Sequence, residues 1–231
     1  MASIQHPHLA MIYGMETWHS MPILVVEYFQ HGTLADRLRR GSLSAPEVRE
    51  LGLSLARALQ YLHGRGLLHR DIKPSNIGLT ENDTPKLLDF GLARVIGTIL
   101  PQRLVEVEVS TRTPATSSDG RNLTRSHHVI GTIAYLAPEA LRYAPPSTTF
   151  DLWSLAVTLY EALAGTHPFI RASVFETANA IVTREAADIR ELRPDCPEGL
   201  AQLLADCLRL DATRRPLTAD DVTARLEAIA C

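Results

Sequence analysis

Lysine is scarce in this chain of 231 residues: of 23 basic residues, 21 are arginine, and only Lys73 and Lys86 are lysine. Any chemistry that requires an ammonium group must therefore use one of these two side chains. Cysteine is scarce as well. The chain has three cysteines, Cys196, Cys207 and Cys231, and no CxxC spacing. An odd number without this spacing argues against a disulfide framework and against a structural zinc site.

Long hydrophobic runs and an excess of one charge are also missing. The longest apolar stretch, residues 152–165, is too short to cross a bilayer and contains Glu161. The N-terminus has neither the basic nor the apolar region of a secretory signal. With 26 acidic and 23 basic residues, the net charge of -3 creates no field that would recruit nucleic acid or an anionic membrane. We therefore expect a cytoplasmic globular protein with no membrane span and no nucleic-acid partner.

Hydrophobic periodicity predicts an α+β chain in which a small strand portion precedes a larger helical one. Extended runs at 9–15 and 23–28, and two short strands between 67 and 91, form the expected strand portion. The best-marked helix begins after Ser44, with Glu47 completing a capping box, and ends at Gly64 or Gly66. Further helices are expected at residues 33–40, 149–165, 171–183, 198–209 and 218–229.

Functional side chains are concentrated between residues 69 and 91. The segment HRDIKPSN occupies residues 69–76, and DFG follows at 89–91. These segments supply two carboxylates, an ammonium group and an amide, which are the groups needed to handle a hydroxyl nucleophile, a phosphoryl group and Mg²⁺. Each Asp or Asn taken alone is explained as well by a loop cap, but the whole set in this order is not. These motifs resemble the catalytic loop and magnesium motif of eukaryotic-type Ser/Thr protein kinases.

The resemblance implies a role for each of these side chains. Asp71 would accept the proton of the substrate hydroxyl, and Lys73 would neutralise charge on the transferred phosphoryl group. Asn76 and Asp89 would bind Mg²⁺, and ATP would be the phosphoryl donor. Lysine two residues after Asp71, and Gly-Thr before the segment YLAPE at 135–139, are similar to the Ser/Thr-directed branch, so the implied substrate is a protein Ser or Thr hydroxyl.

Other parts of the chain resemble structural pieces of the same family. Glu139 in Ala-Pro-Glu looks like the end of the activation segment, residues 89–139, and Arg215 looks like its buried partner. Asp151 would begin the central helix and hold the backbone of the catalytic loop. Glu27 and Phe29 resemble the hinge whose backbone binds adenine, with Val26 as the gatekeeper.

Regulatory positions also follow from the resemblance. Arg70, beside the catalytic Asp, is of the kind that pairs with a phosphate on the activation segment. Residues 101–128 have no apolar period, so burial would not offset the entropy of ordering them. Thr124 and Ser126 are the hydroxyls we expect to be phosphorylated there, whereas Thr132 is expected to contact the catalytic loop.

The chain departs from the family at its N-terminal end. No Gly-rich loop, strand lysine or helix glutamate occurs in the sequence. Lys86 cannot replace the lysine, because we expect it to face solvent from a short strand. Gly78 falls where the family usually has a larger side chain beneath adenine, which predicts a thinner floor for the nucleotide pocket.

We therefore expect a partial protein kinase domain over residues 1–231. Residues 1–30 would be remnant strands of the N-terminal lobe and the hinge, and residues 31–231 would be the C-terminal lobe. A partner chain, a second copy or the missing N-terminal lobe would cover residues 1–30, since two strands alone are marginally stable. The alternative is a non-catalytic scaffold built on the same lobe. A small-molecule phosphotransferase is disfavoured by Thr132 and the Ala-Pro-Glu segment.

Overall fold

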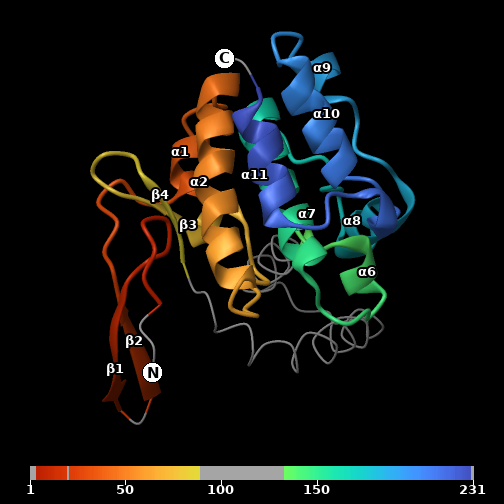
Figure 1. The fold of residues 1–231 in the computed structure, drawn as a ribbon. Coiled ribbons are helices and arrows are strands. Elements are labelled where there is room, and N and C mark those ends of the chain that lie inside the picture. The colour runs from red at the N-terminus through yellow and green to blue at the C-terminus, as the bar shows by residue number, and fades with distance from the viewer. Residues whose placement is uncertain (1–3, 20, 89–132, 230–231) are drawn as a thin grey trace, which may run out of the picture.

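The computed structural model describes residues 4–19, 21–88 and 133–229. Strands β1 (Ile12–Trp18) and β2 (Met21–Val26) form an antiparallel hairpin, which projects away from a helical body (Figure 1). A second antiparallel pair, β3 (Ile77–Leu79) and β4 (Pro85–Leu87), lies beside helix α2. The predicted α+β class, with a small strand portion and a mainly helical remainder, is confirmed.

All helices of the described residues follow the β1–β2 hairpin. They are α1 (Leu34–Leu38), α2 (Ala45–His63), α6 (Pro138–Leu141), α7 (Thr148–Ala164), α8 (Val174–Thr183), α9 (Ile189–Leu192), α10 (Glu198–Cys207) and α11 (Ala219–Glu227), with short 3₁₀ turns at Pro74–Asn76 and Ala212–Arg214. The sequence did not predict α6 and α9. Each has only four residues, which is too short to show a helical period.

Helix α2 forms where its sequence predicts. The Ser44 hydroxyl accepts the backbone N–H of Glu47, and the Glu47 carboxylate accepts the backbone N–H of Ser44, so two donors of the first turn are satisfied. The helix ends at Gly64. Gly52 allows close packing in the middle of the helix, because a Cβ there would lie 3.1 Å from side-chain atoms of both Leu159 and Leu226.

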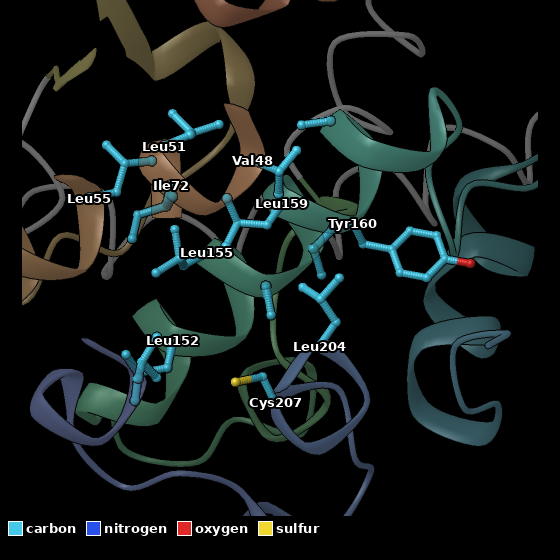
Figure 2. Packing of buried hydrophobic residues seen from close by; sticks show 14 of the residues in the cluster. Val48, Leu51, Leu55, Ile72, Leu152, Leu155, Leu159, Tyr160, Leu204 and Cys207 are labelled. Atoms are coloured by element: carbon cyan, nitrogen blue, oxygen red, sulfur yellow. The ribbon is translucent and has the colours of Figure 1, made fainter. Parts of the chain in front are cut away.

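Helix α7 is the centre of the core. Twelve of its seventeen residues are buried, and it packs against α2, α9 and α10. Figure 2 shows side chains of α2 and α7 facing one another, with Leu204 and Cys207 of α10 on the other side of α7. Gly165 ends α7 in the left-handed region at φ +73°, where glycine is favoured. Residues from the segment before β3, such as Ile72, and from the chain after β4, such as Ile133, are buried in this same core.

The β1–β2 hairpin contrasts with this core. Tyr13, Met15, Trp18 and Met21 are between 60% and 73% exposed, so the described residues leave these four side chains largely uncovered. No helix in the part of the chain that the structure describes is long and apolar enough to cross a membrane.

Candidate active site

Two side chains of the segment 69–76 converge on the carboxylate of a third residue, Asp71. Lys73 Nζ donates to both oxygens of Asp71, at 2.9 and 2.8 Å. Asn76 Nδ2 donates to Asp71 Oδ2 at 2.7 Å and to the Asp71 carbonyl at 2.9 Å. The 3₁₀ turn Pro74–Asn76 folds the chain back and brings the Asn76 amide to Asp71. The Asp71 side chain is still 33% exposed, so a substrate hydroxyl can reach it.

The arrangement fits the chemistry of phosphoryl transfer. Two donors orient the Asp71 carboxylate, which keeps lone pairs on its open side to accept a hydroxyl proton. The amide nitrogen of Asn76 is used by Asp71, so its Oδ1 is the hard oxygen atom that Mg²⁺ would take as a ligand. Lys73 places a positive charge at the same point.

The backbone of this segment is held from the central helix. The Asp151 carboxylate is buried and accepts the backbone N–H of His69 at 2.9 Å and that of Arg70 at 2.7 Å. His63 Nε2 lies 2.8 Å from the same carboxylate. Arg70 has φ +70°, a conformation that costs a non-glycine residue free energy. Asp151 thus fixes a strained turn immediately before Asp71.

A buried ion pair joins the chain after residue 133 to the segment before α11. Arg215 donates to the two carboxylate oxygens of Glu139 at 2.7 and 3.0 Å, and the Arg215 side chain is only 1% exposed. Its guanidinium also lies 4.6 Å from the ring centroid of Trp153 and donates to two backbone carbonyls. The structure therefore contains the pair that the sequence predicted.

The segment after β2 contains a contact of Glu27 that the sequence did not reveal. Lys86 Nζ donates to Glu27 Oε1 at 2.6 Å, and the Met11 N–H donates to Glu27 Oε2 at 3.0 Å. Lys86 is 19% exposed, so its predicted solvent-facing position is wrong. The reason is that β4 pairs with the segment just before β1: the Ala10 N–H donates to the Leu87 carbonyl at 2.9 Å. This pairing brings Lys86 against the end of β2.

The space beside Gly78 is occupied by a side chain from another segment. A Cβ at Gly78 would lie 2.5 Å from two ring atoms of Phe29. The ring of Phe29, which follows β2, therefore fills the space that a side chain at residue 78 would occupy. The predicted thinner floor of a nucleotide pocket stays a prediction.

The protein kinase domain family matches residues 1–225 of this sequence. The chain belongs to the protein kinase family. A probable serine/threonine-protein kinase of Streptomyces coelicolor is 30% identical over 98% of this chain and 32% of its own length. The serine/threonine-protein kinase PknB of Mycolicibacterium smegmatis is 30% identical over 97% of this chain and 34% of its own. The 3-phosphoinositide-dependent protein kinase 1 of Arabidopsis thaliana is 32% identical over 92% and 40%.

The chain spans between about a third and two fifths of the length of these serine/threonine-kinase relatives. The structure brings together Asp71, Lys73 and Asn76 of the predicted site. Four other predicted residues lie outside the described part of the kinase chain: the metal ligand Asp89 and the regulatory residues Thr124, Ser126 and Thr132.

The kinase structure also contains a buried polar cluster that sequence reasoning missed. The Tyr135 hydroxyl donates to Glu161, and the Tyr135 ring meets the His167 ring edge-on at 4.9 Å between centroids. His167 Nδ1 accepts the backbone N–H groups of Phe169 and Ile170. Tyr135 lies at the start of the segment YLAPE, just before α6, and membership of this segment was its only sequence signal. Its partners come from α7 and from the turn that follows it, and no local pattern reveals them.

Burial shifts the ionisation of this cluster. Desolvation raises the pKa of Glu161 above its usual value, and it raises the pKa of the Tyr135 hydroxyl, to which the Glu161 charge also contributes. Desolvation lowers the pKa of His167 to about 3, with a smaller effect from Arg171. His167 is therefore neutral at physiological pH.

Proposed function

We propose that this chain is the catalytic part of a Ser/Thr protein kinase that transfers the γ-phosphoryl group of ATP, with Mg²⁺, to Ser or Thr hydroxyls of a protein substrate. The observation that supports this most strongly is the convergence of Lys73 and Asn76 on the carboxylate of Asp71. A loop cap would need only one of these contacts. Together, the contacts of Lys73 and Asn76 orient the Asp71 carboxylate as a base, place a cation beside it and leave the amide oxygen of Asn76 nearby.

Each residue then has a defined task. Asp71 orients the substrate hydroxyl and accepts its proton, and Lys73 stabilises negative charge on the transferred group. Asn76 Oδ1 and Asp89 would hold Mg²⁺, which when bound supplies charge neutralisation at the phosphate oxygens. The carbonyl of Glu27 and the backbone N–H of Phe29 would bind the adenine edge.

Regulation is proposed at the segment that carries Thr124 and Ser126. A phosphate there would be a dianion able to pair with Arg70. The Arg70 guanidinium suits this task, because its Nε is buried and has no hydrogen-bond partner among the described residues. Thr132 would contact the catalytic loop. We place the protein in the cytoplasm, with a partner chain or a kinase N-terminal lobe covering residues 1–30.

A non-catalytic scaffold is the second candidate. The sequence has no Gly-rich loop and no lysine available for the phosphates besides Lys73, since Lys86 is paired with Glu27. The exposed apolar side chains of the β1–β2 hairpin also suit a surface that binds another protein. This reading predicts that the chain binds a partner and transfers no phosphate.

A transfer assay distinguishes these candidates. The chain is incubated with Mg²⁺, labelled ATP and a protein substrate rich in Ser, Thr and Tyr, and the labelled amino acids are identified after hydrolysis. We expect slow labelling of Ser and Thr that Asp71→Asn abolishes. Labelling of Tyr, or none above the Asp71→Asn background, would contradict the proposal, and the second result would favour the scaffold.

A further inference from the structure

The connection that follows the hinge crosses over strand β3. The Leu79 N–H donates to the Gly32 carbonyl at 2.9 Å, and the Gly32 N–H donates to the Phe29 carbonyl at 3.1 Å. A bridge between Thr33 and Gly78 continues this contact. These hydrogen bonds fix residues 29–33 against β3 and set the ring of Phe29 on Gly78.

The ring occupies the space that a side chain at residue 78 would fill. An added Cβ would lie 2.5 Å from Phe29 Cγ and Cδ1 and 2.7 Å from Cδ2, which is closer than non-bonded carbon atoms approach. Gly78 is buried, and its φ is not in the left-handed region that favours glycine. Glycine is therefore required here by space and not by backbone conformation.

Alternation along β3 decides which side of the strand is involved. Ile77 and Leu79 are 0% and 7% exposed and point into the core, so Gly78 faces the opposite side, where the hinge passes. The Phe29 ring supplies an apolar surface at this place, where Gly78 itself has no side chain. The backbone of Phe29 is also the part of the hinge proposed to bind the adenine edge.

We propose that the Phe29 ring is the floor on which the purine base of the nucleotide rests, and that Phe29 and Gly78 are a complementary pair that sets the shape of this floor. The proposal rests on the proposed function, since it assigns a residue to the nucleotide site of that kinase. An aromatic ring offers a flat face for offset stacking with a base. The site should therefore discriminate in favour of planar purine bases and contribute nothing to the binding of phosphate groups.

Ligand-observed saturation-transfer NMR and calorimetric titration with Mg-ADP test this assignment in the chain as it exists. For the wild type we expect NOEs between the Phe29 ring protons and adenine H2 or H8. Phe29→Ala should weaken ADP binding about tenfold and leave the binding of inorganic triphosphate unchanged. Tyr28→Ala, at a neighbouring side chain that is 83% exposed, is the matched control and should bind ADP as the wild type does.

The complementary pair is tested by a double-mutant cycle. Gly78→Leu should lower both ADP affinity and the melting temperature without nucleotide, because the new side chain displaces the ring. Phe29→Ala/Gly78→Leu should recover affinity and melting temperature most of the way, since leucine then forms the floor. If Gly78→Leu fails to fold, Gly78→Ala serves, because its Cβ alone meets the ring.

The outcomes separate this inference from the proposed function. A wild type that binds no nucleotide would overturn both. ADP binding by the wild type that Phe29→Ala leaves unchanged or strengthens would overturn only the floor, and strengthening would mean that the ring occupies the base site itself. A double variant whose ADP affinity and melting temperature are no higher than those of Gly78→Leu would overturn the complementary pair.

Discussion

The carboxylate of Asp151 accepts the backbone N–H of Arg70 at 2.7 Å, from a position 81 residues further along the chain. Arg70 has φ +70°, and the next residue is Asp71. The central helix thus holds the strained residue that sets the direction of the proposed catalytic base. Strain of this kind costs on the order of 1–3 kcal/mol and persists only where the surroundings fix it.

Asp151→Asn should lower the free energy of unfolding by about 3 kcal/mol. The buried carboxylate serves two backbone N–H donors and lies beside His63, whereas an amide presents a single acceptor oxygen and adds two donors of its own. Urea denaturation measures the change. The control is Asp195→Asn, since the Asp195 side chain is 61% exposed and its loss should cost less than about 1 kcal/mol. Equal effects of the two variants would contradict the role given to Asp151.

The Glu139–Arg215 pair should behave as a buried unit. Arg215→Met leaves the Glu139 carboxylate without its bidentate donor and should destabilise the chain by about 3 kcal/mol. Glu139→Gln should add little to that loss in the double variant. Glu227→Gln is the matched control, because the Arg57–Glu227 pair is about half exposed and contributes little. Additive losses at Glu139 and Arg215 would show that the two side chains act independently.

Lys86→Met should loosen the end of the hairpin near the hinge. The Met11 N–H donates to Glu27 Oε2 while Lys86 holds Oε1, so removal of the ammonium group frees the carboxylate to move. We expect amide hydrogen exchange at Met11 to accelerate about tenfold, and Glu27→Gln to produce a similar change. Arg57→Met should leave exchange at Met11 unaltered. Unchanged exchange in Lys86→Met would mean that the lysine is only a surface residue after all.

The buried His167 should make stability fall in acid. Its pKa is about 3 in the folded chain and 6.5 when unfolded, so between these values the unfolded state binds the extra proton. The His167 contribution is fully present above pH 6.5 and is lost as pH falls towards 3. The contribution of Glu161 to the pH dependence of stability has the opposite sign. Its raised pKa favours the folded state at low pH, where the carboxyl is protonated.

The contribution of His167 is isolated by comparing the pH dependence of stability in the wild type with that in a variant that cannot titrate. His167→Asn keeps an acceptor in place of Nδ1 for the N–H groups of Phe169 and Ile170 but cannot titrate. Denaturation at pH 7.5 and pH 5 should show a smaller loss of stability in the variant than in the wild type. The same loss in both proteins would rule out His167 as the source of the dependence.

The proposed catalytic residues could be predicted from sequence because they lie close together in the chain. Asp71, Lys73 and Asn76 lie within six positions, and a short 3₁₀ turn is enough to bring them together. Helix α2 was equally accessible, since its capping box and apolar period are sequence patterns.

The contacts that escaped prediction join distant segments. Lys86 and Glu27 are 59 positions apart, and Tyr135 and Glu161 are 26 apart. The Lys86 contact depends on β4 pairing with the chain before β1, and no local pattern shows that pairing. The sequence shows Gly78 only as a position without a side chain, and only the folded chain shows that the Phe29 ring fills this space.

The most direct test of the central claim is the rate of phosphoryl transfer from Mg-ATP to a Ser/Thr peptide, measured for the chain alone and for the chain fused behind a kinase N-terminal lobe that carries a Gly-rich loop and strand lysine. The account predicts slow transfer by the chain alone, a large increase in the fusion, and a loss of about 10³-fold when the fusion carries Asp71→Asn. A fusion that folds and binds ATP but transfers phosphate equally with and without Asp71→Asn would contradict it.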